Sequence, residues 1–156
     1  MSNFYQLRNF GGNGESIFKE DFIDYFKIPY KDVRDNIIYR KLEVDYIING
    51  DVKIEIKTTN STNYLYFLEY KLYKKTNEIK TGWFYYSNSN FFVFVLIKTR
   101  KIIFLKRTDE FYIYYEKHIK NKYKLIEDDQ NTIISYYRKV PIKSLRNFIV
   151  EYQRYI

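Results

Sequence analysis

The sequence contains no cysteine and has only two prolines, five glycines and one histidine. The lack of cysteine excludes a fold held by disulfides and a zinc site with thiolate ligands. It also fits a reducing compartment, so we expect a cytoplasmic protein. No apolar run approaches the roughly 20 residues that a membrane-spanning helix needs. The N-terminal stretch MSNFYQLRNF has no apolar core of a signal peptide. We therefore expect no membrane partner.

The bulk composition is that of one folded domain with a basic surface. The chain has 156 residues, of which 46% are hydrophobic, and its formal net charge is +8. A chain of this size buries roughly 70% of its unfolded surface, which is enough for a core. No linker or repeat interrupts it, so we expect a single domain over residues 1–156. The positive charge favours encounters with polyanions such as nucleic acids.

Apolar periodicity predicts an α/β domain whose mixed central β-sheet is flanked by helices. A helix is expected over 15–26 behind a GGNG turn, and another over 109–120 with Thr108 as its N-cap. The run FFVFVLIK is typical of a central strand that is buried on both faces. Further strands are expected in RDNIIYRKLEVDYIIN, DVKIEIKTT, NYLYFLEYKLYKK, IIFLKR and around 133–140, and a last helix from Pro141.

The stretch LEVDYIINGDVKIEIKT contains two alternating runs around an Asn-Gly-Asp turn, which indicates a β-hairpin. A two-residue Asn-Gly loop would pair Ile48 with Asp51, whereas a three-residue loop pairs Ile48 with Val52. Only the longer loop gathers the apolar residues of both strands on one face, where Val44, Tyr46 and Ile48 meet Ile56, Ile54 and Val52. Burial of that face therefore favours the three-residue loop.

The same register would place Asp45 directly across from Glu55, with Cβ atoms about 5 Å apart. Two opposed carboxylates repel each other unless one is protonated or a cation lies between them. Mg²⁺ suits such a pair because it binds carboxylates and keeps several waters. Lys57 would then lie beside the metal-bound water. A plain alternative is that Glu43 faces Lys57 in a cross-strand ion pair on a solvated face.

These residues resemble the motifs of the PD-(D/E)XK nuclease superfamily, which includes restriction endonucleases and Holliday junction resolvases. Its members carry an acid on one hairpin strand and Glu-x-Lys on the next, here Asp45 and then Glu55-Ile56-Lys57. The segments LEVDY, NYLYFLEY and TGWFYYSNSNFFVFV are similar to segments of small phage-type members, although Asn90 stands where aspartate is commoner. The resemblance spans residues 11–98 and implies a restriction-endonuclease-like core.

The resemblance implies a Mg²⁺-dependent endonuclease that hydrolyses phosphodiester bonds in DNA, with Mn²⁺ able to substitute. Asp45, Glu55 and the Ile56 carbonyl would bind the metal, and Lys57 would orient the attacking water or neutralise the oxyanion. A helical acid often completes such a site; Glu15 matches best and Glu20 is the alternative. Glu69 would be an auxiliary residue that orients Lys57 or binds a second ion, and a plain strand-face charge is its other interpretation.

Basic residues outside the hairpin are candidates for contacts with DNA phosphates, and a solvated surface explains them equally well. These are Lys71, Lys98, Arg100 and Lys101. We expect His118 on a helix surface and Trp83 in the core rather than stacked on a base. A junction resolvase would be a symmetric homodimer. The apolar positions of the last helix could form its interface, but we favour packing on the sheet for Leu145, Phe148, Ile149 and Tyr152.

Two other functions stay open from the sequence. The first is a nuclease-like fold that binds nucleic acid without cleaving it, for which the departure at Asn90 is the reason. The second is a phage or mobile-element protein that inhibits a host enzyme by protein interaction, in which case the positive charge has nothing to do with DNA.

Overall fold

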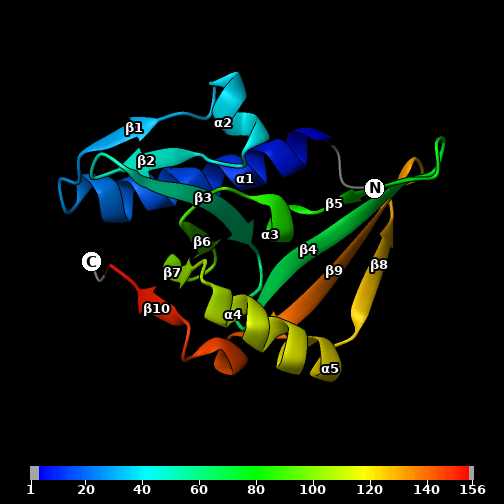
Figure 1. Ribbon diagram of the computed structural model, residues 1–156. Helices are drawn as coiled ribbons and strands as arrows, with labels where there is room; N and C mark the ends of the chain where they lie inside the picture. Colours follow the sequence, from blue (N-terminus) through cyan, green and yellow to red (C-terminus); the bar gives the residue numbers. More distant parts are fainter. Residues whose placement is uncertain (1–3, 155–156) are drawn as a thin grey trace.

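The computed structural model describes the backbone of residues 4–154 and the side chains of residues 11–154 (Figure 1). Its helical segments are α1 (Phe4–Phe18), η1 (Lys19–Asp24), α2 (Ile37–Lys41), α3 (Trp83–Tyr86), α4 (Asp109–Tyr114), η2 (Tyr115–Ile119), α5 (Lys120–Lys122) and η3 (Ile142–Leu145). Within the described range no helix is both long and apolar enough to cross a bilayer. The expected class, α/β with a mixed sheet flanked by helices, is confirmed.

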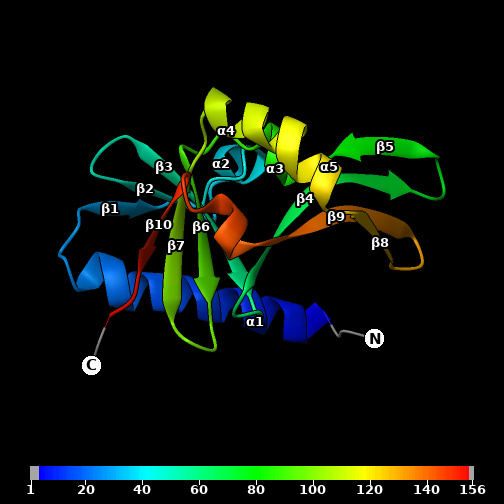
Figure 2. The same ribbon diagram turned by 90° about the horizontal axis from the view of Figure 1, so that it is seen from below.

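The mixed sheet has six strands in the order β1-β2-β3-β6-β7-β10. They are β1 (Tyr30–Asp32), β2 (Tyr46–Ile48), β3 (Val52–Thr59), β6 (Phe91–Leu96), β7 (Lys101–Lys106) and β10 (Ile149–Tyr152). Strand β3 pairs with β6 in parallel, and the other neighbours are antiparallel. Helix α1 runs along one face of this sheet (Figure 2).

Strand β6 is central and buried on both faces, as its continuous apolar run predicts. Phe92 and Phe94 join the core beneath α4, whereas Val93 and Val95 join the core beneath α1. Each of these side chains is at most 1% exposed. Because alternate side chains of β6 point to opposite faces, they contribute to two separate cores, one on each side of the sheet.

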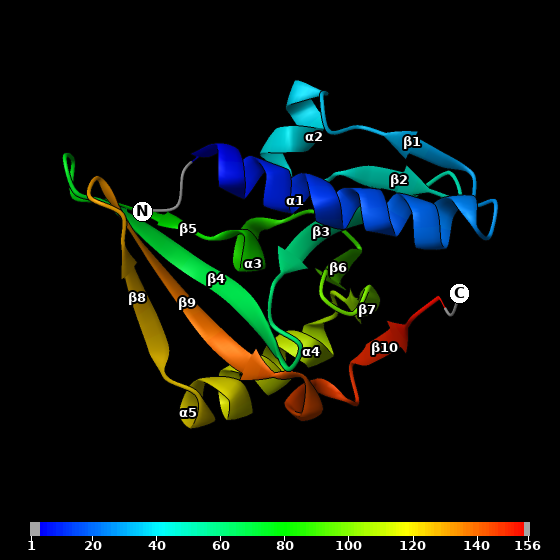
Figure 3. The ribbon, with the colours of Figure 1, turned by 180° about the vertical axis from the view of Figure 1, so that it is seen from behind.

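A second sheet, which the sequence does not predict, contains four antiparallel strands in the order β5-β4-β9-β8. They are β4 (Tyr64–Tyr73), β5 (Glu78–Thr81), β8 (Leu125–Asp129) and β9 (Ile133–Pro141). The segment NYLYFLEY therefore leaves the central sheet after β3 and pairs instead with β9. The two sheets diverge from the region of α3 and α4 (Figure 3).

The hairpin has the register that burial favours. Ile48 pairs with Val52 and Tyr46 with Ile54, so the three-residue loop is confirmed. The direct pairing of Asp45 with Glu55 is wrong, however, because the ladder ends at Tyr46. The chain enters β2 from Glu43 with a φ of 56°, and the Asp45 N–H then bonds the Ile54 carbonyl at 2.8 Å. This irregular entry turns the Asp45 side chain out of the regular cross-strand position.

The expected GGNG turn is also wrong, because these residues lie inside α1. Helix α1 crosses β3 so closely that a Cβ on Gly14 would lie 1.9 Å from Thr58 Oγ1. The Gly11 carbonyl accepts a bond from the same hydroxyl at 3.4 Å. Glycine here allows close contact between a helix and a strand rather than a turn.

A Gly14→Ala substitution should therefore destabilise the protein by about 1–3 kcal/mol, because the added methyl must push α1 away from Thr58. Gly12→Ala is the matched control, since no atom outside the adjoining helix backbone lies within 4 Å of its Cβ position. That change should be neutral or stabilising by up to about 1 kcal/mol, the usual gain of alanine over glycine in a helix. Urea unfolding of both proteins tests this, and equal effects would contradict the close contact.

The end of the chain differs from the prediction, whereas the helix from Asp109 is confirmed. Thr108 Oγ1 accepts the Phe111 N–H at 3.1 Å as the N-cap of α4. The last helix is wrong: only the short η3 follows Pro141, and Ile149–Tyr152 form the edge strand β10 beside β7. Leu145 and Phe148 still pack against the core, as favoured over an interface. Pairing with the exposed edge of β7 overrides the helical spacing.

Candidate active site

Glu55 lies in the middle of β3 and is 1% exposed. Its neighbours Ile54 and Ile56 point to the α1 core, so strand alternation sends Glu55 and Lys57 to the opposite face. The Lys57 ammonium nitrogen lies 2.7 Å from Glu55 Oε1. Apart from the Lys57 ammonium and the Ser87 hydroxyl, which both lower the pKa of Glu55, no group that the structure describes is placed to hydrogen-bond its carboxylate. The carboxylate is thus buried with one cation and one hydroxyl as its polar neighbours.

Asp45 reaches the edge of β3 from just before β2. Its Oδ2 accepts the Ile56 N–H at 2.7 Å, in the place where a longer β2 would continue the ladder. The same side chain thus ends one strand pairing and places a second carboxylate beside the Glu55-Ile56-Lys57 segment. Asp45, Glu55 and Lys57 thus lie on one hairpin, with the Asp45 carboxylate at the backbone of Ile56.

Both carboxyl groups are harder to ionise than usual. Burial raises the pKa of Glu55 to about 8, and the Lys57 ammonium only partly offsets this. Burial also raises the pKa of Asp45 to about 6; the Ile56 N–H counteracts the shift and the charge of Glu15 adds to it. Raised pKa values with identifiable causes are typical of functional sites.

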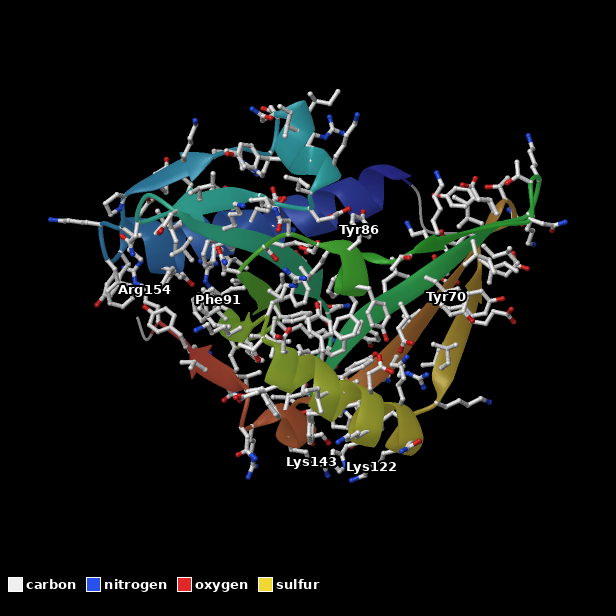
Figure 4. The ribbon with its side chains drawn as sticks, viewed as in Figure 1. Tyr70, Tyr86, Phe91, Lys122, Lys143 and Arg154 are labelled. Carbon is white, nitrogen blue, oxygen red and sulfur yellow. The ribbon has the colours of Figure 1, made fainter. Side chains whose placement is uncertain are left out.

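Lys57 is held between two acids and an aromatic ring. Its ammonium nitrogen lies 3.8 Å from Glu43 Oε2, so the expected Glu43–Lys57 pair is present in addition to the contact with Glu55. It also lies 4.6 Å from the centroid of the Trp83 ring, a cation–π geometry. Trp83 itself packs against the core, as expected. Tyr86, labelled in Figure 4, extends from α3 and donates to Glu43 Oε1 at 2.6 Å.

Glu15 is the helical acid that the fold brings toward Asp45, since its charge acts on that carboxyl. The Arg34 guanidinium contacts Glu15 and also bonds Asp32. Sequence reasoning missed Arg34 because it lies 19 positions from Glu15, in the segment between β1 and α2. No spacing rule of helices or strands connects those two positions.

The alternative helical acid, Glu20, lies elsewhere. Its carboxylate is 3.3 Å from the Arg100 guanidinium, which also makes two 2.8 Å bonds with the buried Asp21. These contacts join the turn after β6 to η1. Arg100 therefore serves the fold, and the structure does not bring Glu20 to the hairpin acids.

Glu69 lies in the second sheet and is 4% exposed. It accepts bonds from the Tyr115 hydroxyl at 2.7 Å and from Arg138 Nε at 2.5 Å. Lys120 is a third cationic or polar neighbour, at 3.8 Å. The structure thus places Glu69 in a buried network between β4, β9 and η2, rather than beside Lys57.

The remaining predicted residues are scattered. Lys98 lies in the exposed turn after β6, Lys101 is 3.8 Å from Glu151, and Lys71 pairs across β4 and β5 with Lys80. Asn90, at the position where aspartate is commoner in the resembled family, bonds Lys53 through both its backbone N–H and its side-chain oxygen. His118 is exposed on η2, as expected.

Residues 11–154 contain no group of three acidic or histidine side chains arranged around one point as metal ligands. Asp45 and Glu55 nevertheless offer carboxylate oxygens, the ligands that a hard divalent cation prefers, and no described backbone N–H occupies the oxygens of Glu55. Comparison of the chain with protein-family models, curated proteins and solved structures gives no match.

Proposed function

We propose that the protein is a Mg²⁺-dependent endonuclease that hydrolyses phosphodiester bonds in DNA, built on a restriction-endonuclease-like core. One observation carries the proposal: Glu55 is buried in the central sheet without a backbone N–H on its carboxylate, next to Lys57 and the Asp45-bonded Ile56. The parallel pairing of β3 with β6 supports it, because this pairing makes the segment with Glu55 and Lys57 the rigid centre of the sheet.

An ionised Glu55 is costly to the fold. A buried ionised carboxylate with incomplete hydrogen bonding destabilises a fold by several kcal/mol, and an apolar residue would pack there without this penalty. Ile54 and Ile56, its two neighbours, show that β3 accepts isoleucine on its other face. The position therefore indicates a demand for an ionisable carboxyl group that folding does not explain.

In this proposal Asp45, Glu55 and the Ile56 carbonyl would hold the metal. Glu15, which also contacts Arg34, would be an additional ligand. The bound ion would supply a hydroxide-like water and stabilise charge on the scissile phosphate. Lys57 supplies a positive charge that is fixed in place by Glu55 and Glu43. That charge would bind a phosphate oxygen and neutralise its growing negative charge.

A nucleic-acid-binding module that does not cleave is the second candidate. The observation that favours it is the existing pairing of two proposed ligands, since Arg34 contacts Glu15 and the Ile56 N–H bonds Asp45. In such a protein the hairpin acids would be structural, and Lys57 would contact phosphate without chemistry.

Incubation with branched, linear duplex and single-stranded DNA, with Mg²⁺ or with EDTA, tests the proposal. We expect Mg²⁺-dependent cleavage of at least one DNA, reduced about 100-fold or more in Asp45→Asn and Glu55→Gln proteins. Glu20→Gln is the matched control, because this helical acid pairs with Arg100 and should retain full activity. Salt-sensitive binding without cleavage would favour the second candidate. If the protein neither bound nor cleaved any of these DNAs, the protein-interaction alternative would be favoured.

A further inference from the structure

A cavity of about 300 Å³ lies between β3 and the second sheet, directly beside Lys57. Its walls include four aromatic side chains, Tyr66, Trp83, Phe94 and Tyr137, and one carboxylate, Asp128. The same Trp83 ring that contacts the Lys57 ammonium thus forms part of the cavity wall. The cavity is therefore adjacent to the proposed active site, and the two share Lys57.

Strand alternation explains why these aromatic residues face inward. On β4, Leu65 and Phe67 are fully buried in the core beneath α4, so Tyr66 and Leu68 point to the other face, toward β3. Tyr137 lies opposite Leu68 on β9 and points the same way. The rings of Tyr66 and Tyr137 are 5.8 Å apart at their centroids. The ribbons of β4 and β9 lead away from the central sheet (Figures 1 and 3).

We propose that this cavity binds an unpaired nucleobase next to the scissile phosphate. The inference rests on the proposed function for the phosphate at Lys57, and it specifies the substrate class as DNA with single-stranded or unpaired nucleotides. The cavity volume is at the lower end of the roughly 300–1,000 Å³ of small-ligand sites, which fits one base better than a larger group.

The chemistry of the walls matches a base. Nucleobases stack on tyrosine and tryptophan rings regardless of their identity, and this contact supplies much of the affinity for single strands. Asp128, an exposed acid at the rim, can accept a hydrogen bond from a base N–H. A base inside a duplex cannot reach the cavity without unpairing, which costs a few kcal/mol. Lys57 at the cavity mouth is placed to hold the adjoining phosphate.

The test uses a short single-stranded oligodeoxyadenylate and a blunt duplex containing the same sequence, both in EDTA so that no cleavage occurs. The chain has one tryptophan, so its fluorescence reports on Trp83 and hence on the cavity wall. We expect the single strand to quench this fluorescence and the duplex to have little effect. Unchanged fluorescence at saturating single strand would overturn the proposal.

Combined Tyr66→Ala and Tyr137→Ala substitution should weaken binding of the single strand by about tenfold or more, because two stacking surfaces are lost. Tyr136→Ala is the matched control: this adjacent tyrosine points to the opposite face and stacks on Tyr70, 4.4 Å away between centroids (Tyr70 is labelled in Figure 4). Circular dichroism shows whether each variant is folded. Equal weakening by the control would overturn the proposal.

The outcomes separate this inference from the proposed function. Single-strand binding that depends on Tyr66 and Tyr137, with no cleavage in Mg²⁺, would support the cavity and reject the nuclease. Cleavage of fully paired duplex DNA that is unaffected by the two tyrosine changes would support the nuclease and reject the cavity.

Discussion

At about pH 8 and without divalent metal, the Glu55→Gln protein should be more stable than the parent by about 2–4 kcal/mol. The parent must either keep Glu55 protonated or bury an ionised carboxylate that is 1% exposed. Glutamine has nearly the same shape and no charge, so this penalty disappears. A residue selected for folding alone would show the opposite sign.

The effect depends on pH in a direction that follows from the pKa of Glu55. Burial raises this pKa from 4.5 to about 8 in the folded protein, so the folded state binds the proton more tightly than the unfolded state. The stability of the parent is therefore complete below about pH 4.5 and falls as the pH rises toward 8. The difference between the two proteins should be small at about pH 4.5 and should grow through that range.

Urea unfolding across this pH range, in EDTA, measures the effect. Glu78→Gln is the control, because Glu78 is exposed on β5 and its removal should leave the pH dependence of the parent intact. If the Glu55→Gln protein showed the same pH dependence as the parent, Glu55 would be ionised at little cost, and the argument for a functional charge would fail.

Replacement of Arg138 by methionine should destabilise the protein by about 3 kcal/mol, the lower end of the usual cost of breaking a buried ion pair, because Glu69 keeps Tyr115 and Lys120 as neighbours. Arg138 Nε lies 2.5 Å from Glu69 Oε2, and Glu69 is 4% exposed. Arg138 also donates to the Tyr123 carbonyl at 2.6 Å, so the same change removes a link between β9 and the end of α5.

A double variant distinguishes the buried charge from lost packing. Glu69→Gln combined with Arg138→Met removes both charges, while the Tyr115 hydroxyl keeps an acceptor at position 69. This protein should regain a large part of the lost stability. Chemical unfolding of the parent, the single and the double variant measures the recovery. A double variant as unstable as Arg138→Met alone would show that packing of the arginine, rather than charge pairing, holds the second sheet.

The parts of the fold that the sequence predicts are those with a strong local pattern. The hairpin register follows from apolar alternation, because a one-residue slip would expose Val44, Tyr46 and Ile48. The Thr108 cap and the buried strand β6 are equally local signals. The failures involve partners distant in sequence: Gly14 opposite Thr58, β10 beside β7, and β4 in a separate sheet.

The residues of the candidate site also fall into a group that local sequence predicts and a group that only packing determines. Asp45, Glu55 and Lys57 are close because one hairpin carries them, and the sequence shows that hairpin directly. Which other acids join them depends on how separate elements pack. Only the structure shows that Glu69 is bonded to Arg138 in the second sheet. The same holds for Glu15, which contacts Arg34 while the other helical acid pairs with Arg100.

The sequence by itself determined the hairpin, its register and the carboxylate pattern on β3, because strand alternation and the burial of apolar side chains act between near neighbours. Tertiary structure alone decided that Glu55 is enclosed, that Asp45 bonds the Ile56 N–H, and that an aromatic cavity opens beside Lys57. Desolvation and cavities arise where separate layers meet, and the spacing of residues along one chain does not specify where those layers come together.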